Sequence, residues 1–120
     1  GRPGIYSARW AKKYGNFHRA GKKIIQLVKN KNKNKKIKNI KAKFICSLTF
    51  CYNKKKITTV GVIEGTISEK LIGKKGFGYD PIFIPKGSKK TFGQMNKKKK
   101  ILTDHRFMAF KKLKYKINTL

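Results

Sequence analysis

Apolar residues recur at helical spacing in two parts of the chain. The first set is Phe17, Ala20, Ile24, Leu27 and Val28, and the second is Phe107, Phe110, Leu113 and Ile117. Asn16 stands before the first set and Thr103 or Asp104 before the second, where a short polar side chain caps the free N–H groups of a helix. The spacing predicts an amphipathic helix from residue 16 to about 29 and another that begins near residue 105.

Alternating apolar positions predict a hairpin between these helices. The even positions of residues 42–52 are apolar, namely Phe44, Cys46, Leu48, Phe50 and Tyr52. Residues 53–56 form the expected turn, and residues 57–67, rich in β-branched side chains, form the expected partner strand. Gly61 and Gly65 indicate a bulge or the close approach of another backbone. Cys46 and Cys51 would lie on opposite faces of one strand, so no disulfide between them is expected.

Shorter signals complete the outline. Pro3 to Trp10 is expected to form a structured loop that leads into a helix, and Ile82 to Ile84 a short strand that ends at Pro85. Residues 29–41 are almost only Lys and Asn, which is typical of a solvated low-complexity connection. Helices and strands in this arrangement predict the α/β class with a mixed sheet.

Charge is the strongest feature of the composition. The 120 residues include 33 Lys and Arg against 4 Asp and Glu, for a formal net charge of +29. Such an excess attracts polyanions, including nucleic acid, nucleotides and anionic membranes. An AT-rich coding sequence, which favours Lys, Asn and Ile, explains the same composition without any function. No apolar run is long enough to cross a bilayer and no signal peptide is recognisable, so we expect a soluble, cytoplasmic protein without a membrane partner.

The last third of the chain offers one group of candidate binding residues. His105 and Arg106 lie in the predicted first turn of a helix, where free N–H groups and the helix dipole favour an anion or an electron-rich edge. Lys100 precedes them and supplies a point charge suited to a phosphate or carbonyl oxygen. A lone histidine is nevertheless more often structural than catalytic, and Lys97 to Lys100 is by default a solvated charge run.

A second group lies in the run from Gly76 to Phe83. Its glycines permit a sharp turn, and Phe77 offers a face on which a base could stack. Asp80 precedes Pro81, which favours an extended backbone and a carboxylate that projects away from the turn. An acid that accepts from ring N–H groups, together with Arg and Lys donors, suits a purine with oxygen at position six, because adenine would leave those donors unpaired. The spacing fits neither a P-loop nor a dinucleotide-binding loop.

The order of these features resembles the inosine triphosphate pyrophosphatase family over nearly all of the chain. The segments that match are Gly1 to Arg9, Asn16, Ala42-x-Phe44-x-Cys46, Gly61, Gly65-x-Ile67, Gly76 to Phe83, Thr91, Lys100 and His105-Arg106. The resemblance implies hydrolysis of ITP, dITP and XTP to monophosphate and pyrophosphate with Mg²⁺, which removes them from the nucleotide pool. It implies a two-lobed, elongated fold around a mixed sheet, and a homodimer. The base-recognition residues that it implies are Phe77, Gly78, Tyr79, Asp80, Lys100, His105 and Arg106.

Departures from the family pattern concern catalysis. The family begins with a Thr-Gly-Asn segment that holds phosphate and continues to an Asp-Asp-Ser-Gly segment with the catalytic aspartate, and neither occurs in residues 1–120. Asp104 stands where the family usually has serine, and Gln94 where it usually has glutamate. No acidic cluster remains, so we assign no catalytic residue and no metal ligand. Residues 1–120 are expected to be the C-terminal, base-recognising portion of one pyrophosphatase domain and to be inactive alone.

Two alternatives follow from the charge and from the missing segments. A basic nucleic-acid-binding protein would lose affinity steeply with salt and would not respond to Asp80→Asn. An inactive, truncated fragment would not fold alone, and a cooperative thermal transition would contradict it. Nonspecific binding of nucleic acid is compatible with the enzyme as well.

Overall fold

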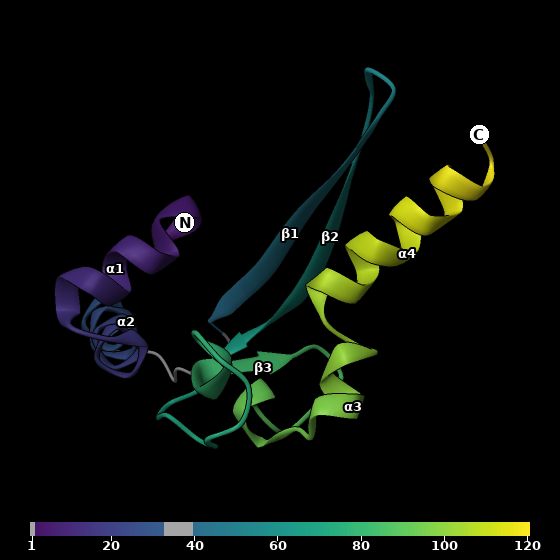
Figure 1. Cartoon of the computed structure of the whole chain (residues 1–120). Coiled ribbons are helices and arrows are strands. Elements are labelled where there is room, and N and C mark those ends of the chain that lie inside the picture. The colour runs from purple at the N-terminus through teal and green to yellow at the C-terminus, as the bar shows by residue number, and fades with distance from the viewer. Residues whose placement is uncertain (1, 33–39) are drawn as a thin grey trace. The chain divides into compact units, whose positions relative to one another are not determined.

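The computed structural model describes residues 2–32 and 40–120. The chain divides into two compact units. Unit 1 contains Gly1–Ala42 and Gly65–Met95, and unit 2 contains Lys43–Glu64 and Asn96–Leu120. The elements of both units are labelled in Figure 1. Most of the predicted Lys/Asn connection, residues 33–39, lies outside the described residues. No helix of the described ranges has the length and apolarity needed to cross a membrane.

Unit 1 begins with helices. A short 3-10 helix, Gly4–Tyr6, leads directly into α1 (Ser7–Tyr14). The prediction of a loop up to Trp10 was therefore wrong over its second half. The turn signal at Pro3 and Gly4 affects only the residues next to it. No helix-breaking residue follows until Gly15, which has φ 108° and ends α1.

The first predicted amphipathic helix is confirmed as α2 (Phe17–Lys31). The Asn16 side chain caps it by accepting a hydrogen bond from the Arg19 N–H at 2.8 Å. Ala20 and Ile25 are buried on its inner face. Local capping and periodicity were sufficient to predict this element.

The predicted hairpin is confirmed as β1 (Lys41–Tyr52) and β2 (Lys55–Ile67). Even positions of β1 are half-buried up to Phe50, but Tyr52 is exposed because it lies next to the turn. The turn is shorter than predicted: Asn53 and Lys54 have φ of 46° and 63°, as a two-residue type I′ turn requires. The hydroxyls of Thr49 and Thr58 hydrogen bond across the strands at 2.8 Å.

The third strand, β3 (Phe83–Pro85), pairs antiparallel with the end of β2, in the order β1-β2-β3. Gly65 lies opposite Pro85, and a Cβ added to Gly65 would clash with the backbone oxygen of Ile84. The close approach predicted for this glycine is thus confirmed. Ile82 belongs instead to a 3-10 helix, Asp80–Ile82. The predicted α/β class is confirmed.

Aromatic packing forms the core of unit 1. Phe83 and Phe92 are both fully buried, and their ring centroids are 5.3 Å apart. Ile82 and Ala20 are buried as well. Phe83, the last residue of the run from Gly76, therefore belongs to this core.

Unit 2 combines the hairpin with α3 (Lys97–Ile101) and α4 (His105–Asn118). Thr59 Oγ1 donates to the Ala109 carbonyl at 2.8 Å, which ties α4 to β2. Asp104 caps α4 through the Phe107 N–H at 2.9 Å, so the aspartate is the cap and not Thr103.

The predicted apolar stripe of α4 is only partly covered: Phe107, Leu113 and Ile117 are half-buried, but Phe110 is not. Phe110 is 53% exposed, whereas Ala109 is fully buried. A small residue is needed there because Gly61 of β2 allows the helix backbone to approach closely: a Cβ on Gly61 would clash with backbone atoms of His105 and Ala109.

Candidate functional site

The candidate site residues fall on both units. Phe77, Gly78, Tyr79 and Asp80 lie in one loop of unit 1. Lys100, His105 and Arg106 lie in α3 and the first turn of α4, in unit 2. Each unit therefore brings its own group together.

The loop of unit 1, which we call the glycine-aromatic loop (residues 73–80), folds around a carboxylate. Gly76 has φ 75°, a conformation that L side chains rarely adopt, and its Cα faces the Asp80 carboxylate so closely that a Cβ would clash with it. Gly78 also has a positive φ, 61°, although a Cβ there would meet only Phe17 at 3.9 Å. Gly76 is thus required by both conformation and space, and Gly78 by conformation.

Asp80 closes this loop. Its Oδ2 accepts a hydrogen bond from the Phe77 N–H at 2.9 Å, and its own N–H donates to the Phe77 carbonyl at 3.2 Å. The side chain is only 2% exposed. The predicted extended conformation of Asp80 is wrong, because these reciprocal bonds hold it at the start of a 3-10 helix, where Pro81 is readily accepted. The carboxylate turns back over the loop and is held there.

Tyr79 anchors the loop to the helices of unit 1. Its hydroxyl donates to the Ser7 carbonyl of α1 at 2.7 Å, and its ring meets Phe17 of α2 edge-on, with centroids 5.3 Å apart. Phe77 is 54% exposed. Tyr79 therefore fixes the position of the loop from within, while Phe77 presents part of its ring at the surface.

Phenylalanine in place of Tyr79 should lower the free energy of unfolding by about 0.5–1.5 kcal/mol at neutral pH, because the bond to Ser7 is lost. Burial raises the pKa of the Tyr79 phenol above its ordinary value of 10.0, so folding favours the protonated form. That contribution is complete below pH 10 and is lost as pH rises through the higher folded pKa. Urea unfolding should show a smaller difference in the free energy of unfolding between the wild-type chain and Tyr79→Phe above pH 10 than at pH 8. A constant difference would contradict this role.

A capping box formed by Thr91 and Gln94 holds the residue just before the glycine-aromatic loop. Thr91 Oγ1 donates to the Ile72 carbonyl at 2.6 Å, and the Thr91 N–H donates to Gln94 Oε1 at 3.0 Å. The side-chain amide oxygen of Gln94 thus accepts the capping hydrogen bond from the Thr91 backbone. Sequence reasoning did not give this pair a role, although the Thr-x-x-Gln spacing is a recognised capping signal.

In unit 2, Lys100 and His105 are packed rather than solvated. Lys97 to Lys99 are exposed, but Lys100 is only 6% exposed. Its carbonyl accepts from the Asp104 N–H at 2.9 Å, which joins α3 to the cap of α4. The His105 ring meets Phe44 of β1 with centroids 5.1 Å apart. Lys100 is therefore distinct from the charge run before it, and Arg106 is the exposed member of this group.

The acidic residues are dispersed. Asp80 binds the Phe77 N–H and Asp104 caps α4. Within residues 2–32 and 40–120, no three His, Cys, Asp or Glu side chains gather as metal ligands would. Cys46 and Cys51 are free thiols, as predicted. These residues therefore do not fit the ligand set of a divalent cation, which takes several oxygens.

Sequence comparison identifies similar proteins over nearly the whole chain. The Ham1 family matches residues 1–116. A dITP/XTP pyrophosphatase of Clostridium perfringens is 41% identical over 115 residues, and one of Dictyoglomus thermophilum is 45% identical over 116 residues. Each alignment covers 95% of this chain and 54% of the relative. The chain thus spans about half the length of the relatives that it matches.

Solved structures show the same fold. A HAM1 protein from Coxiella burnetii superimposes with a TM-score of 0.85 at 26% identity, covering 100% of this chain and 60% of the other. The Ham1 protein of Staphylococcus aureus superimposes with a TM-score of 0.77 at 31% identity, covering 99% of this chain and 59% of the other.

Proposed function

Because the chain belongs to the Ham1 family, we propose that it supplies the base-recognition part of an enzyme that hydrolyses non-canonical purine nucleoside triphosphates. The substrates would be ITP, dITP and XTP, and the products a nucleoside monophosphate and pyrophosphate. The name that the relatives bear, dITP/XTP pyrophosphatase, supports this substrate class.

The observation on which the proposal rests is the buried carboxylate of Asp80, held by the Phe77 N–H. Hypoxanthine and xanthine have an N–H at ring position 1, which a carboxylate can accept, whereas adenine has a bare nitrogen there that a carboxylate would repel. An acceptor already fixed by the protein loses little entropy on binding. The partly exposed ring of Phe77 supplies a face for the base.

The group on unit 2 supplies donors. His105 and Arg106 begin α4, where free N–H groups and the dipole favour an oxygen of the base or of a phosphate. Arg106 and Lys100 add positive charge for the same purpose. We propose that this group binds the six-oxo edge or the phosphates of a purine nucleotide.

Magnesium is proposed as the cation of the hydrolytic step, since a divalent cation neutralises triphosphate charge. The carboxylates described above do not fit as its ligands, so no hydrolytic step is assigned to residues of this chain. The homodimer and the cytoplasmic location stay predictions.

Calorimetric titration of the chain with ITP, XTP and ATP tests the proposal. We expect ITP and XTP to bind at least about tenfold more tightly than ATP, because a mismatched buried polar group costs about 1–3 kcal/mol. GTP, as a further ligand, tells whether a 2-amino group is rejected. Equal affinity for ITP and ATP would contradict base recognition by this chain.

A further inference from the structure

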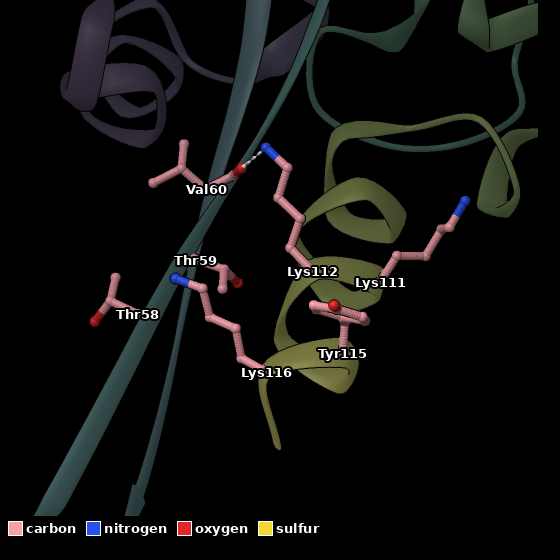
Figure 2. A pocket seen from close by; sticks show the side chains of 7 residues that line it. All are labelled: Thr58, Thr59, Val60, Lys111, Lys112, Tyr115 and Lys116. Carbon is pink, nitrogen blue, oxygen red and sulfur yellow. Dashed lines mark hydrogen bonds between the residues drawn. The ribbon is translucent and has the colours of Figure 1, made fainter. Parts of the chain in front are cut away.

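A groove of about 550 Å³ lies between β2 and α4, within unit 2 (Figure 2). Residues 58–60 of β2 form one wall. Lys111, Lys112, Tyr115 and Lys116 of α4 form the other. The groove has the volume of a typical ligand site, and it uses none of the residues assigned to the nucleotide.

The groove is lined by positive charge without a carboxylate. Three of its lining residues are lysines and none is Asp or Glu. Lys112 Nζ donates to the Val60 carbonyl at 2.8 Å, so this lysine helps to hold α4 on β2. Figure 2 shows Lys116 extending from α4 toward β2 and Lys111 extending away from it. Lys116 is therefore the lysine whose ammonium group lies toward the groove. The Lys111 ammonium group lies at the edge of the groove, over the Phe107 ring and 5.5 Å from its centroid.

The two threonine hydroxyls on the β2 wall of the groove already make hydrogen bonds within the protein. The Thr58 hydroxyl bonds that of Thr49, and the Thr59 hydroxyl donates to Ala109. A ligand would therefore be recognised through charge and through the Tyr115 ring, which is 72% exposed. Such a ligand must be anionic and must offer a flat group for stacking.

The spacing of these side chains suits a repeating anion. Lys111 and Tyr115 are four residues apart on α4, as are Lys112 and Lys116, so they form two neighbouring rows with a rise of about 6 Å. Beyond the groove, the exposed Lys54, Lys55 and Lys56 continue the positive charge along the hairpin. One small anion could contact only one or two of these lysines and would leave the others without a bound counter-charge.

We propose that the groove between β2 and α4 binds single-stranded nucleic acid, with one phosphate at Lys116 in the groove, the next at Lys111 on its edge, and a base stacked on Tyr115. Single strands combine regularly spaced phosphates with unpaired bases, the two features that this surface recognises. An anionic lipid surface would satisfy the lysines but would not need the flat face of Tyr115.

Fluorescence anisotropy of a labelled 12-nucleotide oligo(dT), titrated with the full chain at several salt concentrations, tests the proposal. Lys111→Gln with Lys116→Gln should weaken binding and reduce the slope of log K against log salt by about 1.4, since each contacted phosphate of a single strand contributes about 0.7. Tyr115→Ala should weaken binding about fivefold or more. Lys116→Arg, which keeps the charge, should retain affinity.

The matched control removes the same charge from unit 1. Lys12 and Lys13 are exposed on α1, and their double replacement by Gln should leave both the affinity and the salt slope nearly unchanged. Equal losses in the two double variants would show diffuse attraction to the net charge and would overturn the proposal. It would also be overturned if phosphatidylserine vesicles bound with the same dependence on Lys111, Lys116 and Tyr115 while the oligonucleotide did not compete.

Discussion

Asparagine in place of Asp80 should lower the affinity of the chain for ITP by about 10- to 150-fold and leave its affinity for ATP unchanged or higher. A hydrogen bond to a charged partner contributes about 1.5–3 kcal/mol, and adenine does not offer that bond. The loop should persist in the variant, because the amide oxygen of Asn can still accept from the Phe77 N–H. Calorimetric titration of both proteins with both nucleotides measures the effect.

Asp104 provides the matched control for Asp80. It too is a buried carboxylate, 5% exposed, and it too accepts a hydrogen bond from a backbone N–H, that of Phe107 at 2.9 Å. Asn is an equally good cap, so Asp104→Asn should leave ITP binding and the stability of α4 nearly unchanged. Equal losses in the two variants would show that removal of any buried carboxylate weakens binding. An unchanged affinity for ITP in Asp80→Asn would show that Asp80 does not recognise the base.

Elements with purely local causes were predictable from the sequence. The α2 helix begins at the Asn16 cap and the α4 helix at the Asp104 cap, because capping depends on the side chain and the next three residues. The alternation in β1 likewise needs only one neighbouring strand and one covered face.

Features that depend on distant contacts were not predictable in this way. Gly61, which is 48 residues before Ala109, lets the backbones of β2 and α4 approach closely. The helix therefore buries the small Ala109 and leaves Phe110 53% exposed, which its apolar spacing alone did not predict. The conformation of Asp80 is set by its bonds to Phe77, which outweigh the usual preference before proline.

The candidate site shows both cases. Its residue types and order were sufficient to select the glycine-aromatic loop and the first turn of α4. The hydrogen bonds that hold the loop could not be predicted from the neighbouring sequence. Tyr79 bonds Ser7, 72 residues away, and Thr91 bonds Ile72, 19 residues away. Side chains that position a site through distant backbone carbonyls leave no spacing signal in the sequence.

Alanine in place of Gly61 should lower the free energy of unfolding of unit 2 by about 3 kcal/mol or more. The added Cβ would overlap the backbone of His105 and Ala109 and lie 3.0 Å from Met108 Cβ, and helix backbone cannot rotate away as a flexible side chain can. The α4 helix must then move off β2, which breaks the bond from Thr59 to Ala109. Urea unfolding followed by circular dichroism measures the loss, and amide exchange locates it in α4.

Gly21 is the matched control for this glycine. It lies inside α2, and a Cβ there would meet Leu71 at 3.5 Å and Ile82 at 3.6 Å, which are ordinary contact distances. Gly21→Ala should therefore stabilise unit 1 by about 0.5–1 kcal/mol, because alanine loses less backbone entropy in a helix. Opposite signs in the two variants would establish that the requirement at Gly61 is the close approach of α4 to β2. A small loss in Gly61→Ala, with exchange in α4 unchanged, would mean that the helix does not depend on this contact.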